Sequence, residues 1–341
     1  MKKILVILMV LILATNLFAC TQSPSEEPAQ PAEPNQPEQP VEEPKLDYPK
    51  RAIEVVVPFG PGGSSDLMTR EFANIAANFL DKPMNVVNRA GGGGVDGMVY
   101  VANAPADGYT LLQITPSHAI AEALSRPNAS LTGDFMPIGN FQKDIQLFGV
   151  AANSEFDSIE ELLEYAKANP GKIKIGGTSP GGLDDYMANG FAAEAGIEFT
   201  YVPYNSASET KAAVLGGEID IYQDKVISFL TMVRGGDVKP LVVLNDVRLD
   251  MIEEFADVPS SVELGINFTQ RSWRGYAVRK GTPQEIVDFL EDVLEKVYNS
   301  EQYRESAEET MSDIIPGFIN AEDYGKMWVE EVAKFKEVLA D

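Results

Sequence analysis

The chain has 341 residues, of which 44% are hydrophobic and 23% charged, and this predicts a globular protein of two ordinary domains. Its net charge of −25 argues against nucleic acid as a partner and against a basic membrane-binding surface. One histidine and one cysteine argue against most thiol, zinc and histidine-based catalysis, and we expect no metal site and no cofactor. An anionic ligand stays compatible with this charge, because backbone N–H groups can bind a carboxylate locally.

The N-terminal segment is typical of a bacterial lipoprotein signal peptide. Lys2 and Lys3 precede an apolar run over 4–13, and a Leu-Phe-Ala-Cys sequence ends at Cys20. The apolar run is short for a membrane-spanning helix. We therefore predict a signal peptide over 1–19 and lipidation of Cys20, which places the protein outside the cytoplasmic membrane and anchors it to the lipid bilayer. An uncleaved N-terminal anchor is the alternative.

Residues 20–47 are predicted to be a disordered tether. Proline, glutamate and glutamine dominate this segment, and the prolines recur every three or four residues. Such a composition cannot bury a hydrophobic core and favours an extended, self-repelling spacer. A Pro-rich recognition motif is the alternative, but a lipid-anchored protein needs a spacer at this place.

Strand and helix patterns alternate from residue 53 onward. The strands are predicted over 53–57, 84–87, 110–114, 147–151, 172–176, 199–202, 219–222 and 241–244. The main helices are predicted over 66–80, 95–103, 183–195 and 321–341, with others after capping signals at Ser158, Ser206 and Thr282. The β-α-β order predicts a parallel, doubly wound sheet in the first part, and the later strands predict a second parallel set.

These two sets predict two doubly wound α/β lobes joined by two crossover strands, which we place near Phe148 and Tyr276. Residues 48–147 and 273–341 would form lobe 1, and residues 148–272 would form lobe 2. Ligands of open α/β folds bind at the carboxyl ends of the strands. The predicted ligand site is therefore the cleft between the lobes.

The stretch over 55–66 is the most informative one in the chain. Three valines are followed by a turn rich in proline and glycine, and then by a helix start with Ser64, Ser65 and Asp66. A helix N-terminus behind such a loop presents free N–H groups and the positive end of the helix dipole. This favours an anion site, with a plain strand-to-helix turn as the alternative. The loop over 177–183 repeats this pattern and would face the first loop across the cleft.

From about Tyr48 onward the sequence resembles the extracytoplasmic solute receptors of tripartite tricarboxylate transporters, the Bug-type binding proteins. Each matching motif is weak, but their order and spacing together are specific. The motifs are Val57-Pro58-Phe59-x-Pro61-Gly62-Gly63-x-x-Asp66, Asn88-Arg89-x-Gly91-x-Gly93-Gly94, Ala106-Asp107-Gly108-Tyr109-Thr110-Leu111-Leu112, Val202-Pro203-Tyr204, Gly216-Gly217-Glu218-Ile219-Asp220, Trp273-x-Gly275 and Gly281-Thr282-Pro283.

The resemblance implies a type II periplasmic-binding-protein fold that closes on a small carboxylate. Loop N–H groups, hydroxyls and ordered waters would hold the ligand, with little reliance on arginine. A monomer would deliver it to one large and one small integral membrane subunit of the transporter. The ligand-binding residues implied are Phe59, Pro61, Gly62, Gly63, Ser64, Ser65, Asp66, Thr115, Ser117, Thr178, Ser179, Gly181, Gly182, Leu183, Tyr204, Asn205, Ser206, Ala207 and Asp224.

Two places depart from the family pattern. The second loop has Gly181-Gly182 where the family has Gly-Thr, and Asp185 where the family has histidine. Tyr204-Asn205-Ser206 replaces the usual Tyr-Lys-Gly. Both changes make the site less cationic. They would weaken binding of an additional ligand carboxylate, or favour a ligand with an amine or a carboxylate bound with a metal ion.

Two other functions remain open from the sequence. One is a lipoprotein of the same fold that senses a ligand and takes no part in transport. Its sequence features would be the same as those of a transporter receptor. An enzyme on a bilobal α/β scaffold would need Ser117 and His118, or Asp184 and Asp185, to act as pairs. Neighbouring residues rarely point at one another, so we expect no catalytic residues.

Overall fold

A computed structural model describes residues 46–339 except 127, 129 and 179. The predicted signal peptide, Cys20 and the tether up to residue 45 lie outside the described residues. Residues from Leu46 onward form one compact unit. None of the helices in the described part of the chain is long and apolar enough to cross a membrane.

The first sheet has the strand order β11-β4-β10-β3-β1-β2. Its strand β1 pairs in parallel with β2 and β3, as the sequence predicts, whereas β10 runs antiparallel to β3 and β4. Successive residues of β1, such as Val55 and Val56, face opposite sides of the sheet and enter separate hydrophobic clusters. The strands are β1 (Ile53–Val57), β2 (Met84–Asn88), β3 (Thr110–Ile114), β4 (Phe135–Asp144), β10 (Ser272–Arg279) and β11 (Ile319–Asn320).

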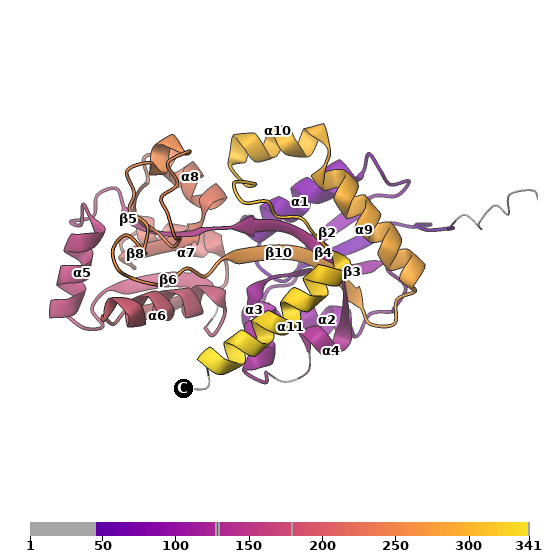
Figure 1. Cartoon of the computed structure of the whole chain (residues 1–341), viewed down its shortest axis with the longest axis horizontal. Coiled ribbons are helices and arrows are strands. Elements are labelled where there is room, and N and C mark those ends of the chain that lie inside the picture. Colours follow the sequence, from indigo (N-terminus) through magenta and orange to yellow (C-terminus); the bar gives the residue numbers. More distant parts are fainter. Residues whose placement is uncertain (1–45, 127, 129, 179, 340–341) are drawn as a thin grey trace, which may run out of the picture. The chain divides into compact units, whose positions relative to one another are not determined.

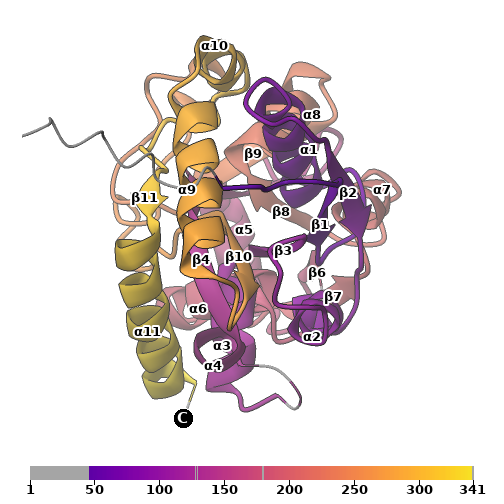
Figure 2. The same cartoon turned by 90° about the vertical axis from the view of Figure 1, so that its right-hand side faces the viewer.

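Helices cover both faces of this sheet (Figure 2). Residues of α1 and α9 pack on the face that Val55 enters, and residues of α2, α3 and α11 pack on the face that Val56 enters. The helices of this part are α1 (Ser64–Ala76), η1 (Gly92–Gly94), α2 (Val95–Ala102), α3 (Pro116–Ala123), α4 (Leu131–Asp134), α9 (Gln284–Tyr298), α10 (Glu301–Thr310) and α11 (Ala321–Val338).

The second sheet has the strand order β7-β6-β8-β5-β9 and is covered by α5 and α6 on one face and by α7 and α8 on the other. Its strands are β5 (Gln146–Ala151), β6 (Lys174–Thr178), β7 (Thr200–Tyr204), β8 (Ile221–Lys225) and β9 (Val238–Val243). Its helices are α5 (Ile159–Ala168), α6 (Leu183–Ala195), α7 (Ala207–Leu215), α8 (Val226–Arg234) and η2 (Glu253–Phe255).

The prediction that this second set is wholly parallel is wrong for one strand. Strand β5 runs antiparallel to both of its neighbours, β8 and β9. The reason is its entry route: β4 ends at Asp144 and β5 begins at Gln146. The chain therefore enters the second sheet directly from the first, without the helix that returns a chain to a parallel start.

Two chain passages join the sheets. One is the β4–β5 ribbon at Ile145, and the other leads from β9 into β10, which begins at Ser272. Figure 1 shows β10 and the β4–β5 ribbon running side by side across the middle of the molecule. A pocket lined in part by Ser272 and Arg274 lies beside these two passages.

Several element boundaries differ from the prediction. Helix α1 begins at Ser64 and ends at Ala76, whereas the prediction placed it over 66–80, and Phe79 beyond its end is 39% exposed. Thr282 does not cap α9, because its Oγ1 donates to the carbonyl of Arg279 and the N-cap position falls on Pro283. Strand β4 and helices α3, α8 and α10 were not predicted. The helix predicted over 321–341 is present as α11, and its Trp328, Val332 and Phe335 are buried.

Candidate functional site

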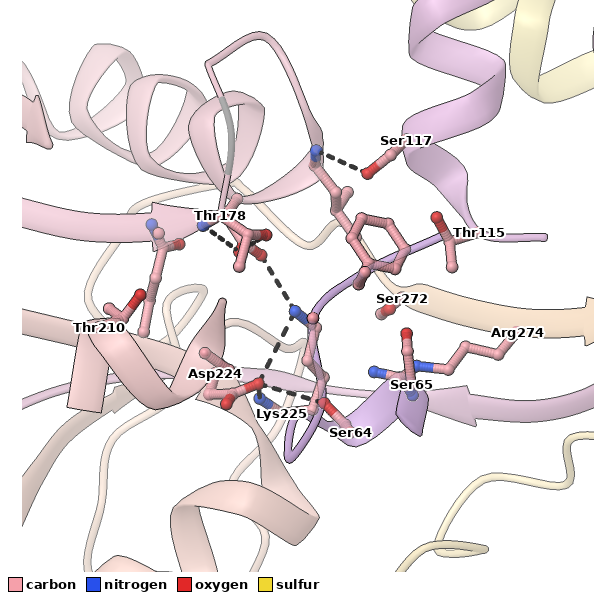
Figure 3. Close-up of a pocket in the computed structure, with 18 residues that line it drawn as sticks. Ser64, Ser65, Thr115, Ser117, Thr178, Thr210, Asp224, Lys225, Ser272 and Arg274 are labelled. Atoms are coloured by element: carbon pink, nitrogen blue, oxygen red, sulfur yellow. Dashed lines mark hydrogen bonds and ion pairs between the residues drawn. The ribbon is translucent and has the colours of Figure 1, made fainter. Parts of the chain in front are cut away.

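A polar pocket lies where the carboxyl ends of strands from both sheets meet, beside the two passages (Figure 3). It is lined from the first sheet by residues of the β1–α1 and β3–α3 loops, and from the second by residues of the β6–α6, β7–α7 and β8–α8 connections. The lining residues are Phe59, Gly60, Gly63, Ser64, Ser65, Thr115, Ser117, Gly177, Thr178, Leu183, Asp184, Ala207, Thr210, Gln223, Asp224, Lys225, Ser272 and Arg274.

Five helices begin at this pocket. Each of α1, α3, α6, α7 and α8 contributes its N-cap residue or a residue of its first turn to the lining. The N-cap residues of α1, α6 and α8 (Gly63, Gly182 and Lys225) make no side-chain cap, which leaves first-turn N–H groups without that partner. Helix dipoles and N–H groups that converge in this way create a positive potential suited to an anion.

The two lobes touch one another around the pocket, which encloses about 50 Å³. The Oγ of Ser64 donates to Oδ1 of Asp224 at 3.3 Å, and the N–H of Leu183 donates to Oγ of Ser117 at 3.1 Å. Both bonds join residues of opposite sheets. A space of this size holds a few water molecules.

Lys225 lies at the end of β8 and carries a positive charge into the pocket. Its Nζ lies 3.0 Å from Oδ1 of Asp184 and 3.8 Å from Oδ1 of Asp224. The side chains are 12%, 7% and 5% exposed, respectively. Burial raises the pKa of Asp184, but Lys225 and two hydrogen bonds from Thr178 outweigh burial and hold that pKa below its usual value. The Asp184 carboxyl is therefore ionised at neutral pH.

Arg274 supplies a second buried cation from β10. Its Nη1 donates to Oε1 of Gln142 at 3.1 Å and to Oδ2 of Asp144 at 3.2 Å. Both charged side chains are 2% exposed. Arg274 also lines the pocket, so an arginine stands in its wall beside the hydroxyl-bearing residues.

Asp66, in the first turn of α1, stabilises the β1–α1 loop. It accepts hydrogen bonds from the N–H of Gly62 at 3.0 Å and from the side chain of Asn88 at 2.9 Å, and it pairs with Arg70. Burial raises the pKa of Asp66, but these partners together lower it below the usual range. This bracing fixes the turn that leads into α1 and so orients Ser64 and Ser65.

The pocket brings together ten of the residues predicted to bind ligand. Ser179 lies outside the described residues, and the remaining predicted residues lie outside the pocket lining. The ten are Phe59, Gly63, Ser64, Ser65, Thr115, Ser117, Thr178, Leu183, Ala207 and Asp224. Those outside the lining are Pro61, Gly62, Asp66, Gly181, Gly182, Tyr204, Asn205 and Ser206.

Asp185, expected to alter the ligand end of the second loop, does not line the pocket. Its Oδ2 accepts from the N–H of Gly181 and its Oδ1 from the side chain of Asn189, both at 2.6 Å. This carboxylate caps the loop before α6. The acidic residues that line the pocket are Asp184 and Asp224 instead.

The prediction missed the two cationic residues that line the pocket, Lys225 and Arg274. Lys225 directly follows Asp224, which was predicted, and Arg274 is the variable position of the Trp273-x-Gly275 motif. The sequence signal that could have identified Lys225 was its position directly after the predicted site residue Asp224, at the end of a strand. The pocket residues that were not predicted are Gly60, Gly177, Asp184, Thr210, Gln223, Lys225, Ser272 and Arg274.

Ser117 and His118 do not form a nucleophile–base pair. The Oγ of Ser117 accepts from Leu183, whereas Nδ1 of His118 accepts from the N–H of Thr115 at 3.0 Å and forms part of the N-terminal cap of α3. Burial lowers the pKa of His118 to about 4, so the ring is neutral at pH 7. His118 has a structural role at a helix start, and Asp184 is paired with Lys225 rather than with Asp185.

Arg126 joins the two lobes at the edge of the cleft. Its Nη2 donates to the carbonyls of Pro180 and Gly181, both at 3.0 Å, and its Nη1 donates to the carbonyl of Gly92 at 3.2 Å. The first two acceptors belong to the β6–α6 loop, and the third belongs to the lobe of the first sheet. Arg126 therefore connects the two sides of the cleft without lining the pocket.

We expect Arg126→Ala to speed ligand dissociation about 5- to 10-fold, because losing these partly exposed bonds costs roughly 1 kcal/mol in the closed form only. Stopped-flow dissociation of a bound acid would measure the rate. Arg51→Ala, which removes an exposed ion pair with Asp107 away from the cleft, is the matched control and should leave the rate unchanged. An unchanged rate in Arg126→Ala would show that its bonds do not contribute to closure.

Two α/β sheets, two passages between them and a polar pocket at the passages are the architecture of the type II periplasmic binding proteins. The chain matches the sequence model described as the tripartite tricarboxylate transporter family receptor, TctC, over residues 68–341. The protein belongs to this family of substrate-binding receptors.

Relatives and solved structures agree with this assignment. The chain is 31% identical over 300 residues to the UPF0065 protein in the gbd 5' region of Cupriavidus necator, which covers 86% of this chain and 88% of the relative. It is 32% identical over 248 residues to protein BugT of Bordetella pertussis, with 71% and 75% covered. The structure of the periplasmic binding protein BugD superposes with a TM-score of 0.79 at 25% identity, covering 86% of this chain and 98% of that one.

A further solved structure, R. palustris Rpa4515 with adipate, has the same TM-score of 0.79 at 25% identity. It covers 86% of this chain and 97% of that one. The ligand in that structure is a small dicarboxylate.

Proposed function

We propose that this protein is a lipid-anchored extracytoplasmic solute receptor that binds a small carboxylate in the pocket and delivers it to the membrane subunits of a tripartite transporter. One observation carries the proposal: five helix N-termini and two buried cations converge on one pocket. Charge-assisted hydrogen bonds of this kind contribute roughly 1.5–3 kcal/mol each. A handful of them suffices for micromolar affinity after the ordering costs of binding.

The family and its structures support the ligand class. The chain belongs to a receptor family of tricarboxylate transporters, and a relative of the same fold is known with adipate. Receptors of this architecture close by hinge motion around their ligand. In this protein we propose that residues 48–147 and 273–341 move as one body against residues 148–272, with the passages at Ile145 and Ser272 as hinges.

The proposed anchor is Cys20, linked to the receptor body by the Pro- and Glu-rich tether. A spacer of this composition would hold the body away from the bilayer while it stays near its membrane partners. Mass spectrometry of protein extracted from membranes would test the anchor. A diacylglycerol-modified N-terminal Cys20 is the expected result, and an N-terminus at Met1 in mature protein would contradict it.

Isothermal titration calorimetry with the ligand-free mature chain would test the function. The panel comprises succinate, malate, glutarate, adipate, citrate, glutamate and benzoate, each titrated at pH 7 and low salt. We expect at least one carboxylate to bind with a micromolar or lower Kd. The corresponding uncharged amides, titrated as controls, should not bind, because they lack the negative charge that the helix N-termini favour. The absence of binding by every acid of the panel, with ligand-free protein verified by native mass spectrometry, would contradict the proposal.

A further inference from the structure

Arg274 occupies an unusual position, on a strand that joins the two lobes and at the same time in the pocket wall. It pairs with Gln142 of β4 in the antiparallel register of β10 and β4. Its side chain is only 2% exposed and nevertheless lines the pocket. Figure 3 shows its guanidinium beside Ser65 and Ser272, both of which also line the pocket.

The guanidinium is only partly engaged by the protein. Its Nη1 makes both recorded bonds, to Gln142 and to Asp144. Within the described part of the chain, Nε and Nη2 have no hydrogen-bond acceptor. Since an arginine has five N–H donors in a fixed fork, this leaves an edge that can bind a planar acid group.

The counterion of Arg274 is a carboxylate at the hinge. Asp144 is the last residue of β4, is 1% exposed, and accepts from the N–H of Ile145 at 3.0 Å through Oδ1. The charged groups that act on it are Arg274 of β10 and, from β8, Lys225 and Asp224. Burial raises the pKa of the Asp144 carboxyl to about 6, although Arg274 and Lys225 pull it down and only Asp224 adds to the rise.

We propose that Arg274 binds an acid group of the ligand and that Asp144 competes for the same guanidinium, so that the ligand binds most tightly when Asp144 carries a proton. This inference rests on the proposed function, because it requires a carboxylate in the pocket. It assigns to Arg274 a direct contact with the ligand and to Asp144 a control over the strength of that contact.

The number of charges around Arg274 determines whether ligand affinity rises or falls with pH. With Asp144 ionised, one buried arginine would be shared by two carboxylates, one from the protein and one from the ligand. Like charges that share a buried site raise each other's pKa, so ligand binding draws a proton onto Asp144. By linkage, ligand affinity rises as pH falls from 8 to 6, by at most about tenfold per pH unit. His118 stays neutral over this range and does not contribute.

Calorimetry of the wild-type chain tests the inference without any variant. Adipate, succinate and malate are titrated between pH 5.5 and 8 in pairs of buffers with different ionisation enthalpies, which reports the protons taken up. We expect uptake that approaches one proton per ligand near pH 7 and a Kd that falls at least 10-fold from pH 8 to pH 6. Binding with no proton uptake at any pH would overturn the inference while leaving the proposed function intact. The absence of binding by every acid would overturn both.

Two variants locate the proton. Asp144→Asn should bind at pH 8 as tightly as the wild type does at pH 6, with a flat pH profile and no proton uptake. Arg274→Gln should weaken binding at all pH values and also flatten the profile. Asp107→Asn, which changes an exposed aspartate far from the pocket wall, is the matched control and should keep the wild-type profile. Proton uptake that persists in Asp144→Asn would show that another group binds the proton.

Discussion

Gly60→Val is expected to weaken ligand binding about 100-fold while leaving the stability of the ligand-free protein close to that of the wild type. A Cβ atom on Gly60 would lie 2.7 Å from Cβ of Ser206 and 3.3 Å from the carbonyl of Asn205. Gly60 belongs to the β1–α1 loop and Ser206 to the opposite lobe, so the overlap arises only when the lobes close. Overpacking of this kind costs roughly 1–3 kcal/mol, and a valine should reach the upper end.

A smaller substitution at Gly60, and the removal of the opposing side chain, serve as controls. Gly60→Ala should weaken binding about 10-fold, and adding Ser206→Gly should restore much of the affinity because it removes the opposing Cβ atom. Glycine is tolerated at an N-cap at a cost of a few tenths of a kcal/mol, so α7 should remain formed. Calorimetric Kd values and thermal unfolding of the ligand-free variants would be compared. Wild-type affinity in Gly60→Val would show that the bound form is more open than this structure.

Lys225→Met should lower the free energy of unfolding by roughly 3–5 kcal/mol at pH 7.5 and abolish binding of the acids. The substitution leaves Asp184 buried without its cation, and Asp224 loses a nearby positive charge. The free energy is measured by urea denaturation.

The pH dependence of this loss follows from Asp184. Because Lys225 holds the pKa of this carboxyl below its usual value, the stabilisation is complete at neutral pH and is lost as the pH falls through the acidic range. The defect of Lys225→Met should therefore be smaller at pH 4.5 than at pH 7.5. The double variant Lys225→Met/Asp184→Asn should recover most of the stability but not the binding. A single variant as stable as the wild type at pH 7.5 would show that the pair is not a stabilising one.

The parts of the site that follow local rules were predictable from the sequence. The three valines of β1, the glycine-rich turn and the serines at the start of α1 act through strand propensity, turn geometry and helix capping, which depend on neighbouring residues only. The loop before α6 repeats these signals. The convergence of the loops follows from the rule that ligands bind at the carboxyl ends of parallel strands.

The polar residues of the crossing strands were not predictable in this way. Strand β4 carries Asn140, Gln142 and Asp144 in buried positions, so its sequence lacks the apolar alternation of an ordinary strand. Those residues are buried because Arg274 and backbone carbonyls of the 312–317 segment satisfy them from distant parts of the chain. Such partnerships depend on the tertiary fold, and no local pattern reports them.

The strand order has a consequence for how the protein acquires its structure. Strand β10 lies between β3 and β4 in the first sheet, although it follows them in the chain by more than a hundred residues. The second sheet, in contrast, is complete once Val243 is available. During vectorial synthesis, the second sheet can therefore form first, whereas β4 cannot join the β3-β1-β2 part of the first sheet until β10 is available. Because such distant pairings form slowly, we expect the last third of the chain to set the folding rate.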